Sequence, residues 1–231
     1  MVEKTSGITA QNELVIDRRF ISMVTLKEKA YLTTKRIFDI LASIIAIILT
    51  SPIFLITSLA ILTTDFGPVF YTQNRIGKGG KLFKIYKFRS MKTNSNEILE
   101  DLLKDPKIKR EWIRNHKLNN DPRITKIGKI IRRFSIDELP QLFNVLKGDM
   151  SIVGNRPYMD SEKKAMGKSY YSILDTKPGI TGVWQTSGRN NLSFKSRLKL
   201  EEEYSYNCSI KSDARIILKT FSAVLGHNGA K

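Results

Sequence analysis

The sequence has 231 residues, and 41% of them are hydrophobic, so it can build one domain of ordinary size with a buried core. Its 39 lysines and arginines against 22 acidic residues give a net charge of +17, which favours a phosphate-bearing partner such as nucleic acid, anionic lipid or a phosphorylated substrate. The single cysteine, Cys208, excludes a disulfide within the chain and a CxxC metal site, and is typical of a reducing compartment.

Residues 1–30 carry acids and no apolar run, which excludes a cleavable secretion signal, and we expect a flexible or partly helical extension there. The segment Ile37–Leu62 follows, and Asp39 is its only charge. It exceeds the length of about 18 apolar residues that indicates a membrane helix. Ser51 and Pro52 lie near its middle, where the proline removes a backbone hydrogen bond and kinks a helix.

Basic residues flank this apolar segment on both sides. Lys35 and Arg36 precede it, and seven lysines and arginines follow from Arg75 to Lys92. Because basic flanks mark the cytoplasmic side, a straight span cannot satisfy both flanks, whereas a helix broken at its centre can enter and leave by one face. From the residues alone, a re-entrant helix and a spanning helix stay equally open.

Val69–Arg89 is expected to form a β-hairpin, since two β-rich runs flank the turn residues 77–80. Its positive charges fit either a surface against lipid headgroups or a solvated edge strand. Ser95–Lys117 has apolar residues at helical spacing with a break at Asp105-Pro106, and suits an amphipathic helix on a core or at a membrane interface. Further helices are predicted at Gln141–Lys147, Leu198–Tyr206 and Ser212–Leu225, and a short strand at Met150–Val153.

Two adjacent acids, Asp137 and Glu138, follow a stretch from Pro122 to Ile136 that carries only positive charges. A carboxylate pair on such a cationic approach is suited to handling a phosphate. Ser135 or Asp137 can cap the helix that follows, and a helix N-terminus attracts anions and keeps carboxylates ionised. The spacing of Ser135 and Glu138 also fits a capping box, in which both side chains only satisfy free backbone N–H groups, and this segment alone favours that interpretation.

The turn Gly154–Pro157 follows the short strand. Arg156 within it can fork onto a phosphate, although an isolated turn of this kind is more often plain surface. The sequence contains no GxxxxGKS/T loop, no GxGxxG helix start, no HExxH and no GxSxG. His116 and His227 are far apart in the sequence and favour neither a metal site nor a base. A carboxylate is therefore the candidate nucleophile, since Asp and Glu attack phosphorus to form acyl phosphates.

Seven motifs stand in order along the chain: Lys87–Met91, Asp121–Thr125, Ser135–Leu142, Val145–Ser151, Arg156-Pro157, Lys177–Gly182 and Gln185–Arg189. Their order and spacing closely resemble the bacterial sugar transferase family, the monotopic phosphoglycosyl transferases, from about Tyr31 to about Val224. Several long motifs in register make this resemblance specific.

The resemblance implies an enzyme that transfers a sugar-1-phosphate from a UDP-sugar to undecaprenyl phosphate and releases UMP, the first membrane step of exopolysaccharide, capsule or O-antigen synthesis. Family members use an Asp-Glu pair and Mg²⁺. By motif position, Asp137 is the nucleophile of a covalent aspartyl-phosphosugar intermediate, Glu138 is its partner, and both are the expected Mg²⁺ ligands. The residues expected to contact phosphate or substrate are Arg156, Arg89, Arg123 and Arg189. Candidates for nucleotide-sugar contacts are Thr181, Gln185, Ser187 and Arg189.

The implied fold is α+β: a re-entrant membrane helix broken at Ser51-Pro52, a small β-hairpin and a mostly helical cytoplasmic catalytic domain with interfacial amphipathic helices. We therefore predict an N-terminal extension (residues 1–30), a re-entrant membrane anchor (31–66) and a catalytic domain (67–231). The expected location is the bacterial cell membrane, monotopic, with the catalytic domain on the cytoplasmic face.

Two features depart from the family pattern. Asn155 replaces the first proline of the usual Gly-Pro-Arg-Pro loop, which puts the rigidity of that loop in doubt. Larger relatives carry extra membrane helices and a regulatory domain upstream, whereas the one apolar segment here resembles the short form.

Two other functions are open to a chain of this composition. A membrane-tethered nucleic-acid or anionic-lipid binding protein without catalysis is motivated by the charge of +17, but acids within the basic stretch would repel a nucleic-acid backbone, so no nucleic acid is expected. An inactive scaffold of the same fold is disfavoured by the intact acid pair and Arg156. UDP-sugar, undecaprenyl phosphate and membrane lipids are the expected partners, and a homo-oligomer is compatible with the sequence. The motifs do not name the sugar, and Glu138 suits a metal ligand, a base or a cap.

Overall fold

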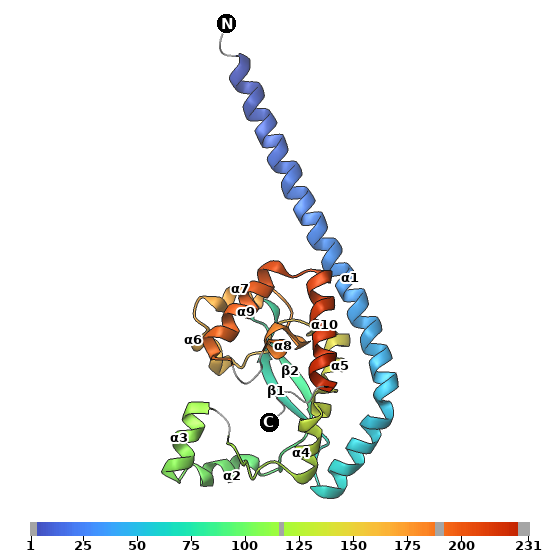
Figure 1. Ribbon diagram of the computed structural model, residues 1–231, viewed down its shortest axis with the longest axis vertical. Coiled ribbons are helices and arrows are strands. Elements are labelled where there is room, and N and C mark those ends of the chain that lie inside the picture. Colours follow the sequence, from blue (N-terminus) through green and yellow to red (C-terminus); the bar gives the residue numbers. More distant parts are fainter. Residues whose placement is uncertain (1–3, 116–117, 188–191, 226–231) are drawn as a thin grey trace.

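The computed structural model describes residues 4–115, 118–187 and 192–225 of the chain. It is mostly helical, with one very long N-terminal helix and, in the described part, two small two-stranded sheets (Figure 1). This arrangement agrees with the predicted α+β class.

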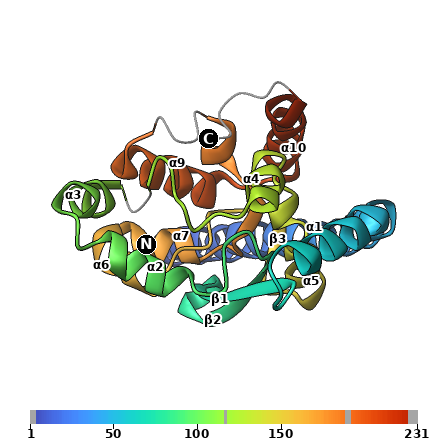
Figure 2. The ribbon, with the colours of Figure 1, turned by 90° about the horizontal axis from the view of Figure 1, so that it is seen from below.

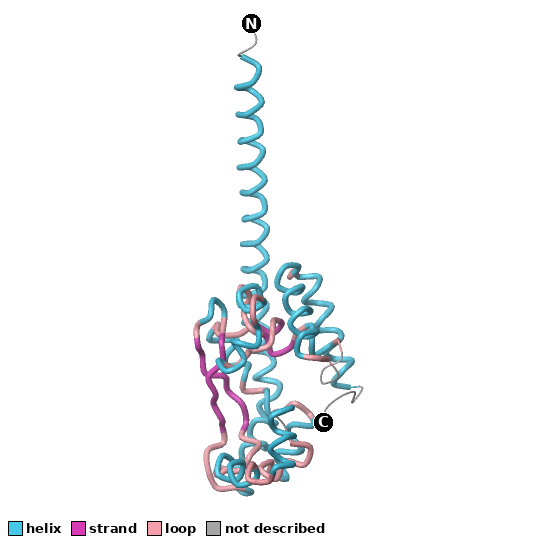
Figure 3. Tube along the Cα trace, turned by 90° about the vertical axis from the view of Figure 1, so that its left-hand side faces the viewer, coloured by secondary structure: helices cyan, strands magenta, loops and turns pink. Residues whose placement is uncertain are grey.

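Helix α1 runs from Lys4 to Thr64 as one element of 61 residues. Its first half projects beyond the rest of the chain, and its second half lies along one flank (Figures 1 and 3). The predicted extension and the predicted anchor therefore share one helix, and no interruption marks the expected boundary at residue 30.

The predicted break at Ser51-Pro52 does not interrupt the helix, since Pro52 lies inside α1, and the helix bends along this part of the chain (Figure 1). Proline lacks the N–H that would bond to the carbonyl four residues before it, which is that of Ile48. The Ser51 hydroxyl donates to this carbonyl at 2.8 Å, so the serine replaces the bond that the proline removes. The chain thus stays helical here, and α1 curves as it follows the flank (Figure 1).

The apolar side chains of α1 face outward. Ile48, Leu49 and Ile56 are 65%, 73% and 66% exposed, whereas Asp39 and Thr57 are buried. A helix on a water-soluble domain has the opposite pattern, with its apolar stripe toward the core. Residues Leu26–Thr64 are long and apolar enough, by length and composition, to cross a membrane.

The start of the apolar stretch is fixed to the rest of the chain by charged groups. Lys35 forms an ion pair of 2.5 Å with Asp213 of helix α10 (Ile210–Leu225). The carboxylate of Asp39, which is buried, accepts hydrogen bonds from Ser151 Oγ at 3.0 Å and from the N–H of Ile152 at 2.9 Å. The single charge in the apolar stretch therefore docks α1 onto a strand.

The end of the same stretch is fixed in the same way. Just past α1, Asp65 forms an ion pair of 3.0 Å with Arg89, which is buried. Near the other end, Arg36 donates to the carbonyls of Val145 and Leu146 at 2.6 and 2.8 Å. Both ends of the apolar stretch are therefore bound to one folded body.

The predicted β-hairpin is confirmed. Strand β1 (Phe70–Ile76) pairs antiparallel with β2 (Leu82–Phe88), with Phe70 opposite Phe88 and Ile76 opposite Leu82 (Figure 3). A 3-10 turn, Lys78–Gly80, joins them. Its two glycines have φ of 67° and 81°, a left-handed backbone that favours glycine.

The β1–β2 hairpin lies along one edge of the folded body, and most of the remaining helices lie to one side of it (Figure 2). The predicted break at Asp105-Pro106 is confirmed, and so is the end of α5 at Gly148, which adopts φ 90°. Besides α10, these helices are α2 (Ser95–Leu102), α3 (Pro106–Asn115), α4 (Lys126–Arg133), α5 (Gln141–Lys147), α6 (Lys163–Met166), α7 (Ser169–Leu174), α8 (Val183–Thr186) and α9 (Phe194–Asn207).

Strands β3 (Ser151–Val153) and β4 (Gly179–Thr181) form a parallel pair. The backbone just after β3 lies close to the backbone just before β4, since a Cβ on Gly154 would be 2.3 Å from the Lys177 carbonyl oxygen. The pairing brings the turn after β3 beside the segment from β4 to α8, although a 3-10 turn and the helices α6 and α7 separate the two in the sequence.

One of the core clusters joins the membrane-type helix to the acid pair. It consists of Ile61 of α1, Phe88 of the hairpin and Ile131 of α4, with Ile136 and Leu139 packed against them. These last two residues flank Asp137 and Glu138, so the turn that carries the acids packs against the contact between α1 and the hairpin.

Candidate active site

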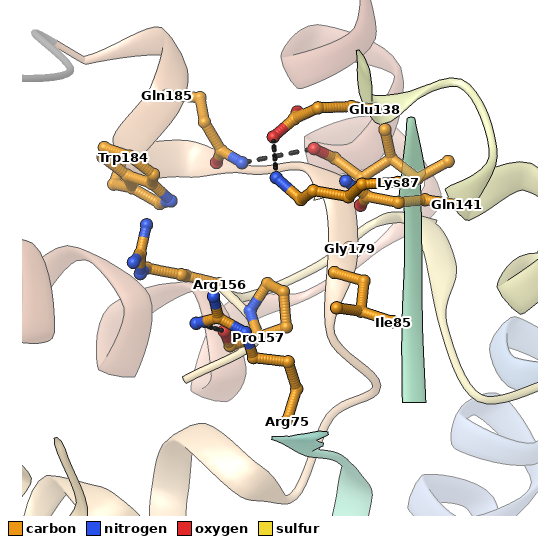
Figure 4. Close-up of a pocket in the computed structure, with 11 residues that line it drawn as sticks. Arg75, Ile85, Lys87, Glu138, Gln141, Arg156, Pro157, Gly179, Trp184 and Gln185 are labelled. Atoms are coloured by element: carbon orange, nitrogen blue, oxygen red, sulfur yellow. Dashed lines mark hydrogen bonds and ion pairs between the residues drawn. The ribbon is translucent and has the colours of Figure 1, made fainter. Parts of the chain in front are cut away.

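A cavity of about 110 Å³ lies between the hairpin, the start of α5 and the β3–β4 pair (Figure 4). Pockets for drug-sized ligands are roughly 300–1,000 Å³, so this one encloses a group the size of a phosphate or a sugar rather than a whole nucleotide sugar. Its lining residues are Arg75, Ile85, Lys87, Glu138, Gln141, Arg156, Pro157, Gly179, Ile180, Trp184 and Gln185.

The acid pair sits in a 3-10 turn, Ile136–Glu138, that precedes α5. The predicted helix cap and capping box are both wrong. Ser135 has φ 56° and its side chain makes no capping hydrogen bond, and α5 begins after Pro140, also without a side-chain cap. The turn is held by backbone bonds instead, from the N–H of Glu138 to the Ser135 carbonyl and from that of Leu139 to the Ile136 carbonyl. Both carboxylates are therefore left available for other groups.

Glu138 lines the cavity and forms an ion pair of 2.7 Å with Lys87 of β2. Both side chains are partly exposed, at 38% and 26%, so solvent screens the pair and it contributes little to stability. A substrate or a metal ion can therefore displace either partner at small cost.

Asp137 is half-buried and is not among the residues that line the cavity. Burial, and then the neighbouring Glu138, raise the pKa of Asp137 to about 6, although the positive charges of Lys87 and Arg132 oppose that rise. Asp137 is thus mostly ionised at neutral pH, but far less hydrated than a surface carboxylate. Such a group is suited to nucleophilic attack.

The structure places Arg156 in the cavity, as the sequence predicted for a phosphate contact. Its guanidinium lies 5.6 Å from the centre of the Trp184 ring, and its Nε is buried without a hydrogen-bond partner among the described residues. Its backbone N–H donates to Glu201 of α9 at 3.0 Å, and the Tyr158 hydroxyl donates to the same carboxylate at 2.7 Å.

Asn155, the departure from the family loop, is buried and anchors this turn. Its side-chain amide donates to the Ile173 carbonyl at 3.1 Å, to Thr176 Oγ1 at 3.1 Å and to Ser205 Oγ at 2.7 Å. These hydrogen bonds of Asn155 fix the loop, in place of the backbone restriction that a proline would give.

The other predicted arginines lie elsewhere. Arg89 is buried against Asp65, and Arg123 is buried in a two-pronged contact with Asp121, with distances of 2.6 to 3.1 Å. Neither lines the cavity, because each is occupied by an acid of its own. Arg189 lies outside the described residues.

The candidates for nucleotide-sugar contacts also lie in different places, one at the cavity and others outside it. Gln185 lines the cavity. Thr181 is buried, with its hydroxyl 2.7 Å from that of Thr220 in α10, and Ser187 is exposed at the end of α8. Of these described residues, only Gln185 faces the cavity.

Sequence reasoning did not select several residues that surround the cavity. Lys87 was noticed only as part of a motif and Arg75 only as part of a basic flank, and Trp184 lies between two of the motifs. Arg197 of α9, whose guanidinium lies 4.3 Å from the centre of the Trp184 ring, gave no signal at all. These residues come from separate elements, and only the packing of the hairpin and α9 around Trp184 brings them together.

Asp137 and Glu138 are compatible with Mg²⁺. Mg²⁺ is usually bound by one or two carboxylates together with substrate phosphates, which two adjacent acids can satisfy. Within the described residues no group of three or more His, Cys, Asp and Glu could hold a metal by itself. The donor set therefore fits an ion that arrives with a phosphorylated ligand rather than a permanently closed metal site.

A turn with two carboxylates lies near arginine nitrogens that have no hydrogen-bond partner among the described residues, and such a set of groups is suited to binding a phosphorylated ligand. The bacterial sugar transferase family matches residues 30–227, and the chain belongs to that family. The resemblance stated from the motifs is thereby confirmed.

Three relatives illustrate the match. The chain is 47% identical over 197 residues to an undecaprenyl-phosphate galactose phosphotransferase of Salmonella typhimurium, covering 85% of this chain and 41% of that one. It is 45% identical to the galactosyl transferase CpsE of Streptococcus agalactiae, covering 91% and 47%. It is 41% identical to the exopolysaccharide production protein ExoY of Rhizobium meliloti, covering 85% and 87%. The chain thus spans less than half of the first two relatives and most of the third.

Proposed function

We propose that this chain transfers a sugar-1-phosphate from a UDP-sugar to undecaprenyl phosphate and releases UMP, as the first membrane step of exopolysaccharide, capsule or O-antigen synthesis. The observation that carries the proposal is the cavity in which Glu138 and Lys87 meet Arg75 and Arg156, next to the half-buried Asp137. Two of the relatives are named for galactose, which makes UDP-galactose the first donor to test.

In the proposed first step, a carboxylate oxygen of Asp137 attacks the sugar-bearing phosphorus. A new bond forms between that oxygen and phosphorus, the bond to the bridging oxygen breaks, and that oxygen leaves with the electron pair as part of UMP. Asp137 must rotate toward the cavity for this attack, a movement that catalytic groups commonly make when a substrate binds. In the second step, the phosphate of the lipid attacks the same phosphorus and restores the Asp137 carboxylate.

The cations around the site have defined roles in this scheme. Lys87 and Arg132 lower the pKa of Asp137 against the effect of burial and so keep the nucleophile ionised. Lys87 also neutralises the charge of Glu138 until the substrate binds. Mg²⁺ held by Asp137, Glu138 and the donor phosphates would supply positive charge where negative charge develops.

The core beneath the acid turn suits a lipid acceptor. Ile136 and Leu139 pack in the cluster that contains Ile61 of α1, and Phe54 of α1 lies 5.1 Å from the Phe88 ring, centre to centre. The turn that carries the two acids therefore packs against α1, the helix with many exposed apolar side chains. A phosphate on a membrane lipid and a sugar nucleotide in the cytoplasm can meet at such a place.

The proposal is tested by measuring UMP release from a panel of UDP-sugars, in detergent with undecaprenyl phosphate. Release from one or a few donors, dependent on the lipid for repeated turnover, is expected. Asp137→Asn should lower turnover by at least about 10³-fold, because the nucleophile of a covalent mechanism is lost. Asp101→Asn is the matched control, since Asp101 is 75% exposed on α2 and pairs only with Lys104. Full turnover by the Asp137 variant would refute the mechanism, and absence of release from every donor would refute the function.

A further inference from the structure

The cavity has two chemically different ends (Figure 4). Glu138 and Lys87 lie at one end and neutralise each other in an ion pair of 2.7 Å. Arg75 and Arg156 lie toward the other end, with Trp184 beside Arg156. One end therefore has an acid and a base, whereas the other has two cations.

The two arginines lack adequate counter-charge. The Nε atoms of both are buried without a hydrogen-bond partner in the described parts of the chain. Glu162 lies 4.0 Å from Arg156, and one of its oxygens accepts the Met159 N–H. Glu201 accepts a hydrogen bond from the backbone N–H of Arg156 and forms no ion pair with its guanidinium within the described residues. Burial, and then the neighbouring charge of Arg156, lower the pKa of Arg75. Half-buried cations in this state are stabilised by an anion.

Arg75 is also held in place before any ligand arrives. Its Nη1 donates to the Pro157 carbonyl at 3.1 Å and its Nη2 to Gln73 Oε1 at 2.6 Å. These bonds tie strand β1 to the turn that carries Arg156, and they leave other donors of the planar guanidinium free. A fixed fork with free N–H groups is suited to binding phosphate oxygens.

We propose that Arg75, together with Arg156, binds the nucleoside-linked phosphate of the donor diphosphate, while the Glu138 end of the cavity receives the sugar-linked phosphate. This inference rests on the proposed function and assigns the two phosphates to the two ends. The nucleoside-linked phosphate gains negative charge when its bond to the sugar-linked phosphorus breaks and it leaves as part of UMP. Arg75 is therefore a binding residue for the donor and for the leaving group.

The test compares UMP with uridine as ligands of the purified full-length protein in detergent. The two differ only in the phosphate, so the ratio of their dissociation constants measures the phosphate contact. We expect Arg75→Gln to reduce the preference for UMP by about tenfold or more, the size of one charge-assisted hydrogen bond. The dissociation constant of the variant for uridine should stay within about twofold of the wild-type value, which also shows that the cavity is folded.

Arg110→Gln provides the matched control, because it removes the same charge from an exposed arginine on α3 whose Nε bonds only to the carbonyl of Pro106. The ratio of the dissociation constants of this variant for UMP and uridine should equal that of the wild type. If Arg75→Gln does not fold, Arg75→Lys replaces it. A lysine keeps the charge and loses the fork, and the preference should fall severalfold.

The outcomes separate this inference from the function on which it rests. A wild-type protein that releases UMP from a UDP-sugar, and whose variant keeps the full preference for UMP over uridine, would refute the role of Arg75 and leave the function standing. A wild-type protein that shows no transfer and no preference for UMP would refute both. Transfer by the wild type, with the preference lost only in the Arg75 variants, supports both.

Discussion

Glu201 is a buried carboxylate that supports the cavity without lining it. It is fully enclosed on α9, where it accepts hydrogen bonds from the Arg156 N–H and the Tyr158 hydroxyl. Burial raises the pKa of Glu201 to about 7, although both hydrogen bonds and the charges of Arg156 and Arg197 lower it. The turn that carries Arg156 therefore rests on a group that titrates close to neutral pH.

This titration predicts a pH-dependent stability. The pKa rises from 4.5 in the unfolded chain to about 7 in the fold, so the folded protein binds the proton more tightly. Its contribution is fully present below pH 4.5 and is lost as pH rises through about 7, a change on the order of 3 kcal/mol. Thermal unfolding in detergent should show a Tm several degrees lower at pH 8 than at pH 5, and Glu201→Gln should flatten that fall.

The matched control is Glu203→Gln, on the exposed face of the same helix. It should keep the wild-type dependence on pH. An unchanged dependence in Glu201→Gln would show that another group controls the effect.

At the residue scale, the sequence selected some of the residues that line the cavity but not the partners of the others. Glu138, Arg156 and Gln185 do line the cavity, because motifs place residue types that suit phosphate and sugar. Arg89 was expected there too, but its partner Asp65 is 24 residues away and is found only in the folded chain. The cap at Ser135 was wrong because a serine with φ 56° breaks the capping rule, and composition does not indicate that backbone.

At the scale of elements, α1 decides how the chain meets the membrane. Lys35 is paired with Asp213 at the start of the apolar stretch, and Asp65 with Arg89 at its end. A straight span would separate these two points by the thickness of a bilayer, about 30 Å of hydrocarbon, and could not keep both contacts with one body on one side. These contacts favour a re-entrant, monotopic anchor, which we propose, and the cytoplasmic orientation of the catalytic body stays a prediction.

Cysteine labelling tests this topology. In a Cys208→Ser background, Leu32→Cys before the apolar stretch and Ser222→Cys on α10 should both react with a membrane-impermeant maleimide in inside-out vesicles and not in intact cells. Leu49→Cys, at a side chain that is 73% exposed, should react in neither, because lipid would surround it. Labelling of the Leu32→Cys variant in intact cells would contradict the proposal and indicate a spanning helix.

The sequence indicated most elements and missed how α1 continues. Local signals located the hairpin, the break before Pro106 and the end of α5 at Gly148, because turn residues and glycine act within a few positions. At Pro52 the chain stays helical because the Ser51 hydroxyl donates to the carbonyl that the proline leaves without a partner, a compensation between two residues that the proline rule does not include.

At the scale of the whole molecule, the fold joins a helix with exposed apolar side chains to a cavity lined by acidic and basic residues. Helix α1 covers one flank, and the hairpin, the acid turn and the β3–β4 pair enclose the cavity beside it (Figures 1 and 4). The sequence could predict both parts but not the cavity, since its walls come from segments that lie far apart along the chain. The charge of +17 fits a body that attracts two phosphorylated substrates to one membrane surface.

The most direct test of the central claim is the intact mass of the protein after incubation with its UDP-sugar in the absence of lipid acceptor. Asp137 as nucleophile predicts one added sugar phosphate, located on the peptide that contains Asp137 and removed when undecaprenyl phosphate is supplied. Asp137→Asn should show no addition, and Asp101→Asn should match the wild type. Turnover without any adduct under rapid-quench conditions, or an adduct on a different residue, would contradict the account.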